Sequence, residues 1–348
     1  MNQNRIDLIR PDAPPRVRGA WRVGVTTTTV VDAARLHLDG RVAARSLRVE
    51  MWVPTADEGT GGTYDTVLRD GVTRVTLHGA ALRDAAALAG DWPLVILSHG
   101  YPGNRHLMAH LGEALASHGY RVASIDHPGS TYDDKADFAQ TLWHRPLDQQ
   151  AVARHFGGDH VIIGYSMGGY GALIAGGAGI SVAALDLMGA AEAEVYARHR
   201  APKVDGALKG IIPIGPWGRH KAVWDAAGLS GLQVPMLTMA GSHDDISGYS
   251  NGMRLIFDEA AGARWLLTFH HAGHNAAAPY PAPQEAWVPS AHLEFVPFEH
   301  YGDAVWDTVR MNNIAAHVAA GFLGLVLKGE AEGPQAEGLA GVTLDHRM

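Results

Sequence analysis

The residues best suited to covalent chemistry lie in segment 164–168, Gly-Tyr-Ser-Met-Gly. It matches G-x-S-x-G, a pattern in which the serine stands on a sharp turn between a strand and a helix. An apolar run, 161–163, precedes the motif, and a small-residue segment of helical character, 168–175, follows it. We therefore interpret Ser166 as a nucleophile. The alternative is a glycine-rich packing turn whose serine only caps the helix.

A nucleophilic serine needs a neighbouring base, because its hydroxyl is almost wholly protonated at neutral pH. Among the 20 histidines, His274 is our candidate, since it lies in a glycine-flanked loop just beyond the apolar run 265–269. Gly273 would free this loop to direct His274 across the sheet edge. His270 and His271, nearer the end of the run, are the competing candidates.

The triad acid should follow a strand that lies between the serine and the histidine in the chain. Segment 241–245 (GSHDD) follows the apolar run 235–240 and contains two aspartates. We predict Asp244 as the acid, on the expectation that Ile246 returns to the core, whereas Asp245 would face solvent or cap the next helix. Such a carboxylate orients the imidazole and stabilises its charged form.

An oxyanion formed during acyl transfer needs two preorganised N–H donors. Met167, directly after the nucleophile, is predicted to supply one backbone N–H. The glycine-rich segment 98–103 (SHGYPG) is predicted to supply the other from Tyr101, because Pro102 has no N–H. The alternative for this segment is a plain strand-to-helix connection.

Apolar runs alternate with helix-period segments from residue 94 onward. This alternation predicts an α/β protein with a mostly parallel, twisted sheet and helices on both faces. The expected strands of this part are 94–98, 120–126, 161–163, 210–214, 235–240 and 265–269. The expected helices are 107–118, 146–156, 168–175 and 303–327. Two β-rich runs near the start, 23–31 and 47–53, predict an antiparallel pair followed by a loop at 57–64.

The chain is predicted to form one catalytic domain, 19–328, after an N-terminal arm, 1–18. Residues 176–208 are too long for a simple connection, and we expect a small helical insertion there that is a candidate cap over the ligand-binding edge of the sheet. The Gly/Glu/Ala-rich tail, 329–348, is expected to be mobile or to dock as an arm.

Composition excludes several classes of protein. With no cysteine, the chain has no disulfide, no thiolate metal site and no cysteine nucleophile. A formal charge of −8 without Lys/Arg runs argues against nucleic-acid and membrane partners, so a small molecule is the expected partner.

No nucleotide-binding glycine motif follows a strand, so no cofactor is expected. The N-terminus lacks the apolar run of a signal peptide, which favours a cytoplasmic protein.

Four segments in this order, SHGYPGNR (98–105), GYSMGG (164–169), GSHDD (241–245) and AGHN (272–275), resemble those of α/β-hydrolase fold serine hydrolases. The first of them, with segment 114–130 and the early LRVEMWV strand, is similar to bacterial platelet-activating-factor-acetylhydrolase-like esterases. That group is often labelled together with dienelactone hydrolases, whose mechanism needs the cysteine that this chain lacks. The resemblance implies cleavage of carboxylic esters through an acyl-enzyme.

Segment 215–218 (GPWG), together with Tyr101 and Met167, is similar to polyester hydrolases and bacterial cutinases, in which the Trp borders the acyl-binding cleft. This resemblance implies that Trp217 forms a substrate wall. The alternative is a Trp that packs against the insertion. His127, at the end of an expected strand, is a second candidate for substrate binding or else a structural histidine.

Amide, imide and polyester hydrolysis use the same machinery and are alternative activities. A non-catalytic ligand-binding protein on the same fold is the alternative from another class. His99, His127 and His144 could form a metal site with neighbouring aspartates, but they show no metal-binding spacing, so we expect no metal.

Overall fold

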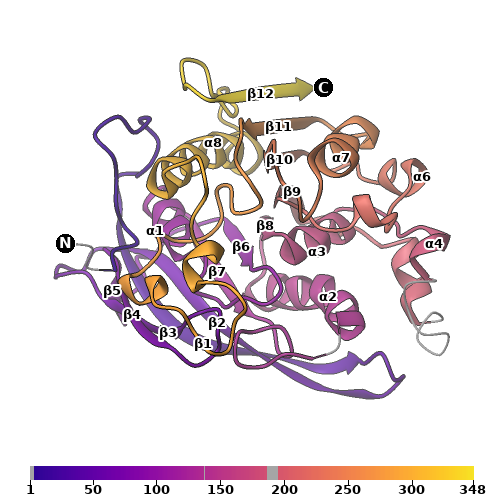
Figure 1. Ribbon diagram of the computed structural model, residues 1–348, viewed down its shortest axis with the longest axis horizontal. Coiled ribbons are helices and arrows are strands. Elements are labelled where there is room, and N and C mark those ends of the chain that lie inside the picture. The colour runs from indigo at the N-terminus through magenta and orange to yellow at the C-terminus, as the bar shows by residue number, and fades with distance from the viewer. Residues whose placement is uncertain (1–3, 137, 186–194) are drawn as a thin grey trace.

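A ten-stranded sheet forms the centre of the protein (Figure 1). The structure is a computed structural model that describes residues 4–136, 138–185 and 195–348. The strand order is β12-β11-β10-β9-β8-β6-β7-β2-β1-β5, and β6 to β11 all run parallel to their neighbours within this group. The strands are β1 Arg22–Leu36, β2 Val42–Thr55, β5 Leu82–Arg83, β6 Leu94–Ser98, β7 Arg121–Asp126, β8 His160–Tyr165, β9 Leu208–Ile214, β10 Met236–Gly241, β11 Arg264–Phe269 and β12 Val342–Arg347. The predicted mostly parallel α/β sheet is confirmed.

Helices cover both faces of the sheet. Figure 1 shows α1 and α8 on one face and α2 and α3 on the other. The helices are α1 Ala109–Ser117, α2 Phe138–Phe156, α3 Met167–Ala175, α4 Val182–Leu185, α6 Ala226–Leu229, α7 Arg254–Glu259 and α8 Thr308–Lys328. Within the described ranges, no helix is both long enough and apolar enough to cross a membrane.

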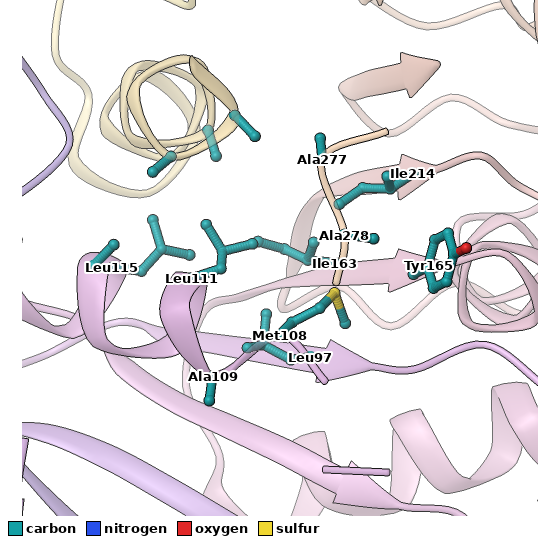
Figure 2. Close-up of a cluster of buried hydrophobic side chains, with 14 of the residues drawn as sticks. Leu97, Met108, Ala109, Leu111, Leu115, Ile163, Tyr165, Ile214, Ala277 and Ala278 are labelled. Carbon is teal, nitrogen blue, oxygen red and sulfur yellow. The ribbon is translucent and has the colours of Figure 1, made fainter. Parts of the chain in front are cut away.

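The central strands β6, β8 and β10 are buried at every position and mostly apolar, because each face of the sheet has its own core. In β6, Val95 and Leu97 pack into the core beneath α1 and α8, whereas Leu94 and Ile96 pack into the core beneath α2 and α3. Figure 2 shows the first of these cores, where Leu97 lies among side chains from α1 and from β8. The period-two alternation of strand side chains thus fixes which residues each helix layer covers.

The first two strands form a long antiparallel ribbon, in which Val25 pairs with Trp52. This confirms the antiparallel pair predicted from runs 23–31 and 47–53, although each strand is longer than its run. β2 joins the ribbon to the parallel strands by pairing antiparallel with β7.

A separate hairpin of β3 (Thr63–Val67) and β4 (Arg74–His78) was missed by the sequence analysis. The loop expected at 57–64 ends where β3 begins. Both segments alternate apolar and polar residues around an Asp70-Gly71 turn, which is a hairpin signal that could have been used. The turn of this hairpin carries Arg69.

Helix α2 begins at Phe138, eight residues before the predicted start at Pro146. The prediction placed Pro146 at the first turn, where proline is tolerated, but it lies inside the helix. Leu142 and Trp143, which precede it, are buried in the core under α2 and α3. Their burial offsets the cost of a proline in the helix interior, which is about 3 kcal/mol.

The C-terminal helix begins later than predicted, whereas the tail follows one of its two expected alternatives. Helix α8 begins at Thr308 rather than at Asp303, and the Asp307 side chain caps it by accepting a hydrogen bond from the Arg310 N–H. The tail docks as an arm, because β12 pairs antiparallel with β11 at the sheet edge.

Residues 186–194 of the expected insertion 176–208 lie outside the described residues. Its described part contains α4 and a helical turn, Ala197–Arg200. His199 packs edge-on against Trp143 of α2, with ring centroids 4.5 Å apart.

Candidate active site

Ser166 lies on the turn between β8 and α3 and has an unusual backbone conformation, with φ 52° and ψ −109°. A non-glycine residue at positive φ is strained and persists only where the surrounding structure enforces it. The Ser166 N–H donates to the Ile214 carbonyl at 2.8 Å, which fixes the turn against β9. The serine side chain makes no capping hydrogen bond to α3, so the helix-cap alternative does not describe this residue.

The glycines on both sides of Ser166 are required by close backbone contacts. A Cβ on Gly164 would lie 2.1 Å from the Gly168 carbonyl oxygen. A Cβ on Gly168 would lie 2.0 Å from the Ser98 carbonyl oxygen. The G-x-S-x-G spacing therefore follows from how tightly the turn packs on itself and on the end of β6.

The structure brings Ser166, His274 and Asp244 together in one hydrogen-bonded chain. The His274 Nε2 lies 3.0 Å from the Ser166 Oγ, and the His274 Nδ1 lies 2.8 Å from the Asp244 Oδ2. These distances are within hydrogen-bond reach for a nucleophile, a base and an orienting carboxylate. His270 and His271 follow the end of β11 but take no part in this chain of contacts.

The second carboxylate oxygen of Asp244, which does not face His274, is also hydrogen-bonded. Its Oδ1 accepts hydrogen bonds from the backbone N–H groups of Ile246 (2.9 Å) and Ser247 (2.7 Å), and the side chain is buried. The sequence argument that Ile246 returns to the core is wrong, because Ile246 is 52% exposed. Asp245 is exposed at the pocket rim. Asp244 faces His274 because the backbone turns around its carboxylate.

The loop carrying His274 is anchored by residues that sequence reasoning did not identify. The Gly273 N–H donates to the Asp303 Oδ2 at 2.7 Å. The Asn275 Nδ2 donates to the carbonyls of Glu299 (2.7 Å) and Gly302 (2.8 Å). Since Asp303 and Glu299 lie far along the chain, no local pattern could have revealed these contacts.

The loop after β6 lies against the nucleophile. A Cβ on Gly100 would be 3.3 Å from the Ser166 Cβ, so this glycine permits the close approach. Tyr101 follows Gly100 in the same pocket wall. Met167 is the first residue of α3, where a backbone N–H has no partner within the helix. Both predicted oxyanion donors are therefore adjacent in the chain to residues that line the pocket.

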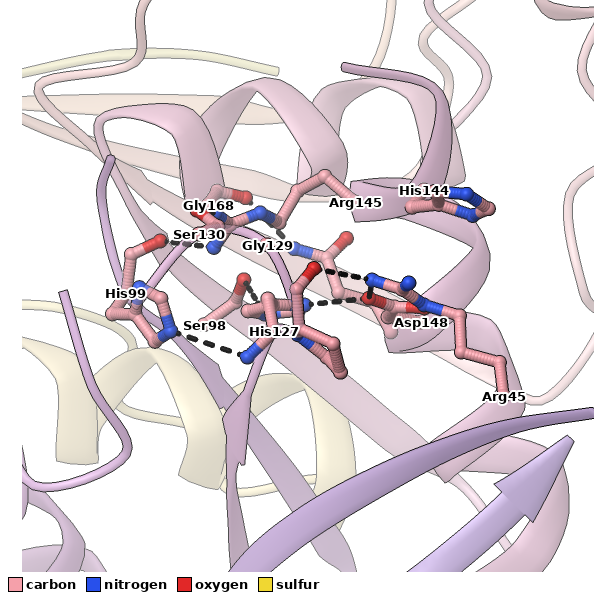
Figure 3. A network of polar contacts seen from close by, with 12 residues as sticks. Arg45, Ser98, His99, His127, Gly129, Ser130, His144, Arg145, Asp148 and Gly168 are labelled. Atoms are coloured by element: carbon pink, nitrogen blue, oxygen red, sulfur yellow. Dashed lines mark hydrogen bonds and ion pairs between the residues drawn. The ribbon is translucent and has the colours of Figure 1, made fainter. Parts of the chain in front are cut away.

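A buried arginine, Arg145, holds this loop from inside the protein (Figure 3). Arg145 of α2 donates to the His99 carbonyl at 2.5 Å, to the Gly100 carbonyl at 3.4 Å and to the Ser130 hydroxyl. The His99 Nδ1 also donates to the Gly100 carbonyl at 2.7 Å. Burial lowers the pKa of Arg145 to about 9, because removing this cation from water disfavours its charged form.

The prediction that His127 binds substrate is wrong. His127 is 1% exposed and lies inside the network of Figure 3. Its Nε2 is 2.9 Å from the Ser98 Oγ, and its Nδ1 is 3.0 Å from the Asp148 Oδ2. The same pattern of contacts, from Ser to His to Asp, occurs in a catalytic triad. Here all three side chains are buried away from the pocket, so this array is structural.

Trp217 packs in a second layer behind the pocket wall. Its ring lies edge-on to Phe138 with centroids 5.0 Å apart, and Phe138 lies edge-on to Tyr101 at 5.4 Å. Trp217 is not among the residues that line the pocket beside Ser166. Trp217 therefore supports the pocket wall through Phe138 and Tyr101, and direct contact between Trp217 and substrate stays a prediction.

The described residues of the 176–208 insertion do not line the pocket beside Ser166 either. The segment 295–300, before α8, lies there instead. Across the described ranges, no group of three or more His, Asp or Glu side chains is arranged to hold a metal ion.

Comparisons with known proteins support the assignment of the fold. A family model described as alpha/beta hydrolase fold matches residues 93–213, and one described as platelet-activating factor acetylhydrolase, isoform II, matches residues 14–145. The chain has the α/β-hydrolase fold. A solved ferulic acid esterase from Streptomyces cinnamoneus has a TM-score of 0.65 at 18% identity, with 98% of this chain and 99% of that chain covered. No curated protein sequence matches. The predicted resemblance to α/β-hydrolase esterases of the acetylhydrolase type is confirmed.

The pocket beside Ser166 and His274 is a cavity of about 430 Å³. Part of its wall was missed by the sequence analysis, because it comes from the β3–β4 turn and from the segment before α8. These missed residues are Arg69, Phe295, Glu299 and His300. Phe295 and Tyr101 give the pocket an aromatic surface, and Arg69 adds a cation.

Buried histidines give the stability of the protein a defined pH dependence. Burial lowers the pKa of His110, His127 and His144 to about 3, whereas the unfolded chain restores them to about 6.5. Below pH 6.5 the unfolded state therefore binds protons that the folded state does not, and the free energy of unfolding falls as the pH falls. Urea unfolding is expected to show a loss of about 3–6 kcal/mol between pH 7 and pH 5. Equal stability at both pH values would contradict the burial of these neutral rings.

Proposed function

We propose that the protein hydrolyses carboxylic esters through an acyl-enzyme formed on Ser166. The observation that carries this proposal is the position of His274, which contacts the Ser166 Oγ at 3.0 Å and the Asp244 Oδ2 at 2.8 Å. The match to an acetylhydrolase family model over residues 14–145 favours an ester as the substrate.

In the proposed reaction, the Ser166 oxygen attacks the ester carbonyl while the His274 Nε2 accepts the serine proton. The charged imidazole is stabilised by Asp244, which stays ionised. His274 then gives the proton to the leaving alkoxide, and the acyl group remains on Ser166. A water molecule, deprotonated by His274, attacks the acyl carbonyl and releases the acid, with the proton returning to Ser166.

The backbone N–H groups of Tyr101 and Met167 are the proposed oxyanion donors. In a trans peptide, the carbonyl and the N–H point in opposite directions. The Gly100 carbonyl, which belongs to the same peptide as the Tyr101 N–H, is held by His99 and Arg145 on the buried side. Arg145 therefore acts as a positioning residue that directs the Tyr101 N–H toward the pocket.

Labelling with a fluorophosphonate probe tests the nucleophile. Wild-type protein is expected to be labelled, and Ser166→Ala to lose both the label and at least about 10⁴-fold in kcat. The matched control is Ser98→Ala, since Ser98 is the serine of the buried Ser–His–Asp array and should not react. Labelling that persists in folded Ser166→Ala, or disappears in folded Ser98→Ala, would contradict the proposal. Absence of labelling in folded wild type would instead favour a non-catalytic binding protein.

The two neighbouring aspartates provide a test of the triad acid. Asp244→Asn is expected to lower kcat by about 10³–10⁴-fold, because the amide no longer stabilises the charged His274. Asp245→Asn removes an exposed carboxylate that does not contact His274, so kcat should change by less than about threefold. Steady-state kinetics on p-nitrophenyl acetate measures both, and the reverse ranking would reassign the acid to Asp245.

Arg145→Met tests the oxyanion loop. Loss of its hydrogen bonds to the loop should lower kcat about 10–100-fold with little change in KM, because an oxyanion donor acts in the transition state. Affinity for a boronic acid, which forms a tetrahedral adduct with Ser166, should fall in parallel. The control is Arg121→Met, because Arg121, like Arg145, donates to backbone carbonyls, in its case those of Trp92, Phe156 and Gly157, which lie outside the oxyanion loop. An equal loss of kcat in both folded variants would mean that Arg145 contributes only to stability.

A further inference from the structure

The catalytic pocket contains an arginine that the proposed chemistry does not use. Arg69 lies in the β3–β4 turn and lines the pocket together with Ser166 and Tyr101. Its Nη1 donates to the Pro102 carbonyl at 3.2 Å, which fixes the guanidinium beside the loop that carries the Tyr101 N–H. Arg69 is therefore positioned next to the place where an ester carbonyl would react.

Within the described ranges, no carboxylate contacts the remaining N–H groups of Arg69. Among the described residues, the Pro102 carbonyl is the hydrogen-bond acceptor found for the Arg69 side chain, and no carboxylate forms an ion pair with Arg69. Arg105, on the neighbouring loop, instead pairs with both Glu50 and Asp126. A half-buried guanidinium with unused donors is suited to a planar carboxylate, which it can bind through two parallel hydrogen bonds.

The two carboxylates that line the pocket do not cancel the charge of Arg69, and His300 adds no charge of its own. Asp245 and Glu299 are exposed at the rim, where water and salt weaken their fields. His300 contributes no charge, because burial and then the charge of Arg69 hold its pKa well below the usual value, and its Nε2 is bonded to the Tyr132 hydroxyl at 2.7 Å. Arg69 is therefore the least exposed permanent charge of the pocket.

We infer that the preferred substrates are esters that carry a carboxylate, which Arg69 binds while Ser166 attacks the ester carbonyl. This inference rests on the proposed esterase function and specifies its substrate class. The aromatic surfaces of Tyr101 and Phe295 are suited to an aromatic or other apolar body between the two groups. A pocket of about 430 Å³ is large enough for a small diacid monoester of this kind.

Two pairs of esters, matched in shape, separate charge from size. In the first pair, 4-acetoxybenzoate and 4-acetoxybenzamide, the charge lies on the alcohol side. In the second, monomethyl terephthalate and methyl 4-carbamoylbenzoate, it lies on the acyl side. Wild type is expected to show a kcat/KM at least about tenfold higher for the carboxylate member of one pair, and that pair identifies which side of the ester Arg69 faces. High salt should reduce the preference.

Variants identify the residue responsible. In the responsive pair, Arg69→Met is expected to lower the ratio of kcat/KM for the carboxylate ester to kcat/KM for the neutral ester by at least about tenfold, mainly by raising KM for the carboxylate ester. Arg69→Lys should retain part of this ratio. The matched control is Arg74→Met, because Arg74 is an exposed arginine of the same hairpin that lines a different cavity. This variant should keep the wild-type preference.

The outcomes distinguish this inference from the function on which it rests. Equal hydrolysis of both members of each pair, a preference for the neutral members, or a preference that survives Arg69→Met would overturn the role of Arg69 while the esterase function stands. Failure to hydrolyse any of the four esters, in protein that still reacts with the fluorophosphonate at Ser166, would also overturn it. Protein that neither labels nor hydrolyses would overturn the proposed function itself.

Discussion

The strained turn at Ser166 is the constraint on which the rest of the site depends. A serine at φ 52° and ψ −109° costs about 1–3 kcal/mol relative to ordinary backbone. The packing of β8 on one side and of α3 on the other offsets this cost. Gly164 and Gly168 are needed because any side chain there would collide with backbone oxygens about 2 Å away. In return, the Ser166 hydroxyl is presented to His274 rather than to the helix.

The parallel sheet explains how residues far apart in the chain reach this serine. Ser98, Tyr165, Gly241 and Phe269 end neighbouring or nearly neighbouring strands at the same edge of the sheet. The loops that follow them supply the proposed oxyanion segment, nucleophile, acid and base, as expected for ligand sites of such sheets. Beneath the edge, the Arg145 network of Figure 3 holds the first of these loops.

Local patterns were sufficient to predict the sheet and to select Ser166 and His274, which the fold brings into contact, because each depends on a strand followed by glycines. They were insufficient where position depends on distant packing. His127 follows the end of a strand, and His274 lies only a few residues beyond one. The His127 ring is nevertheless buried and contacts Asp148 of α2, a residue that no local spacing connects with it. Arg69 was missed with its hairpin, although the Asp70-Gly71 turn was visible in the sequence. Asp244 was identified through an incorrect expectation about Ile246.

The central claim is that an acyl group passes through Ser166. It is tested most directly by mixing the protein with p-nitrophenyl acetate, quenching in acid within one turnover, and mapping the modified peptide by mass spectrometry. The account predicts a single acetyl group on the peptide that contains Ser166, formed with the burst of p-nitrophenol and lost as hydrolysis proceeds. Turnover without any acetylated peptide, or acetylation confined to another residue, would contradict it.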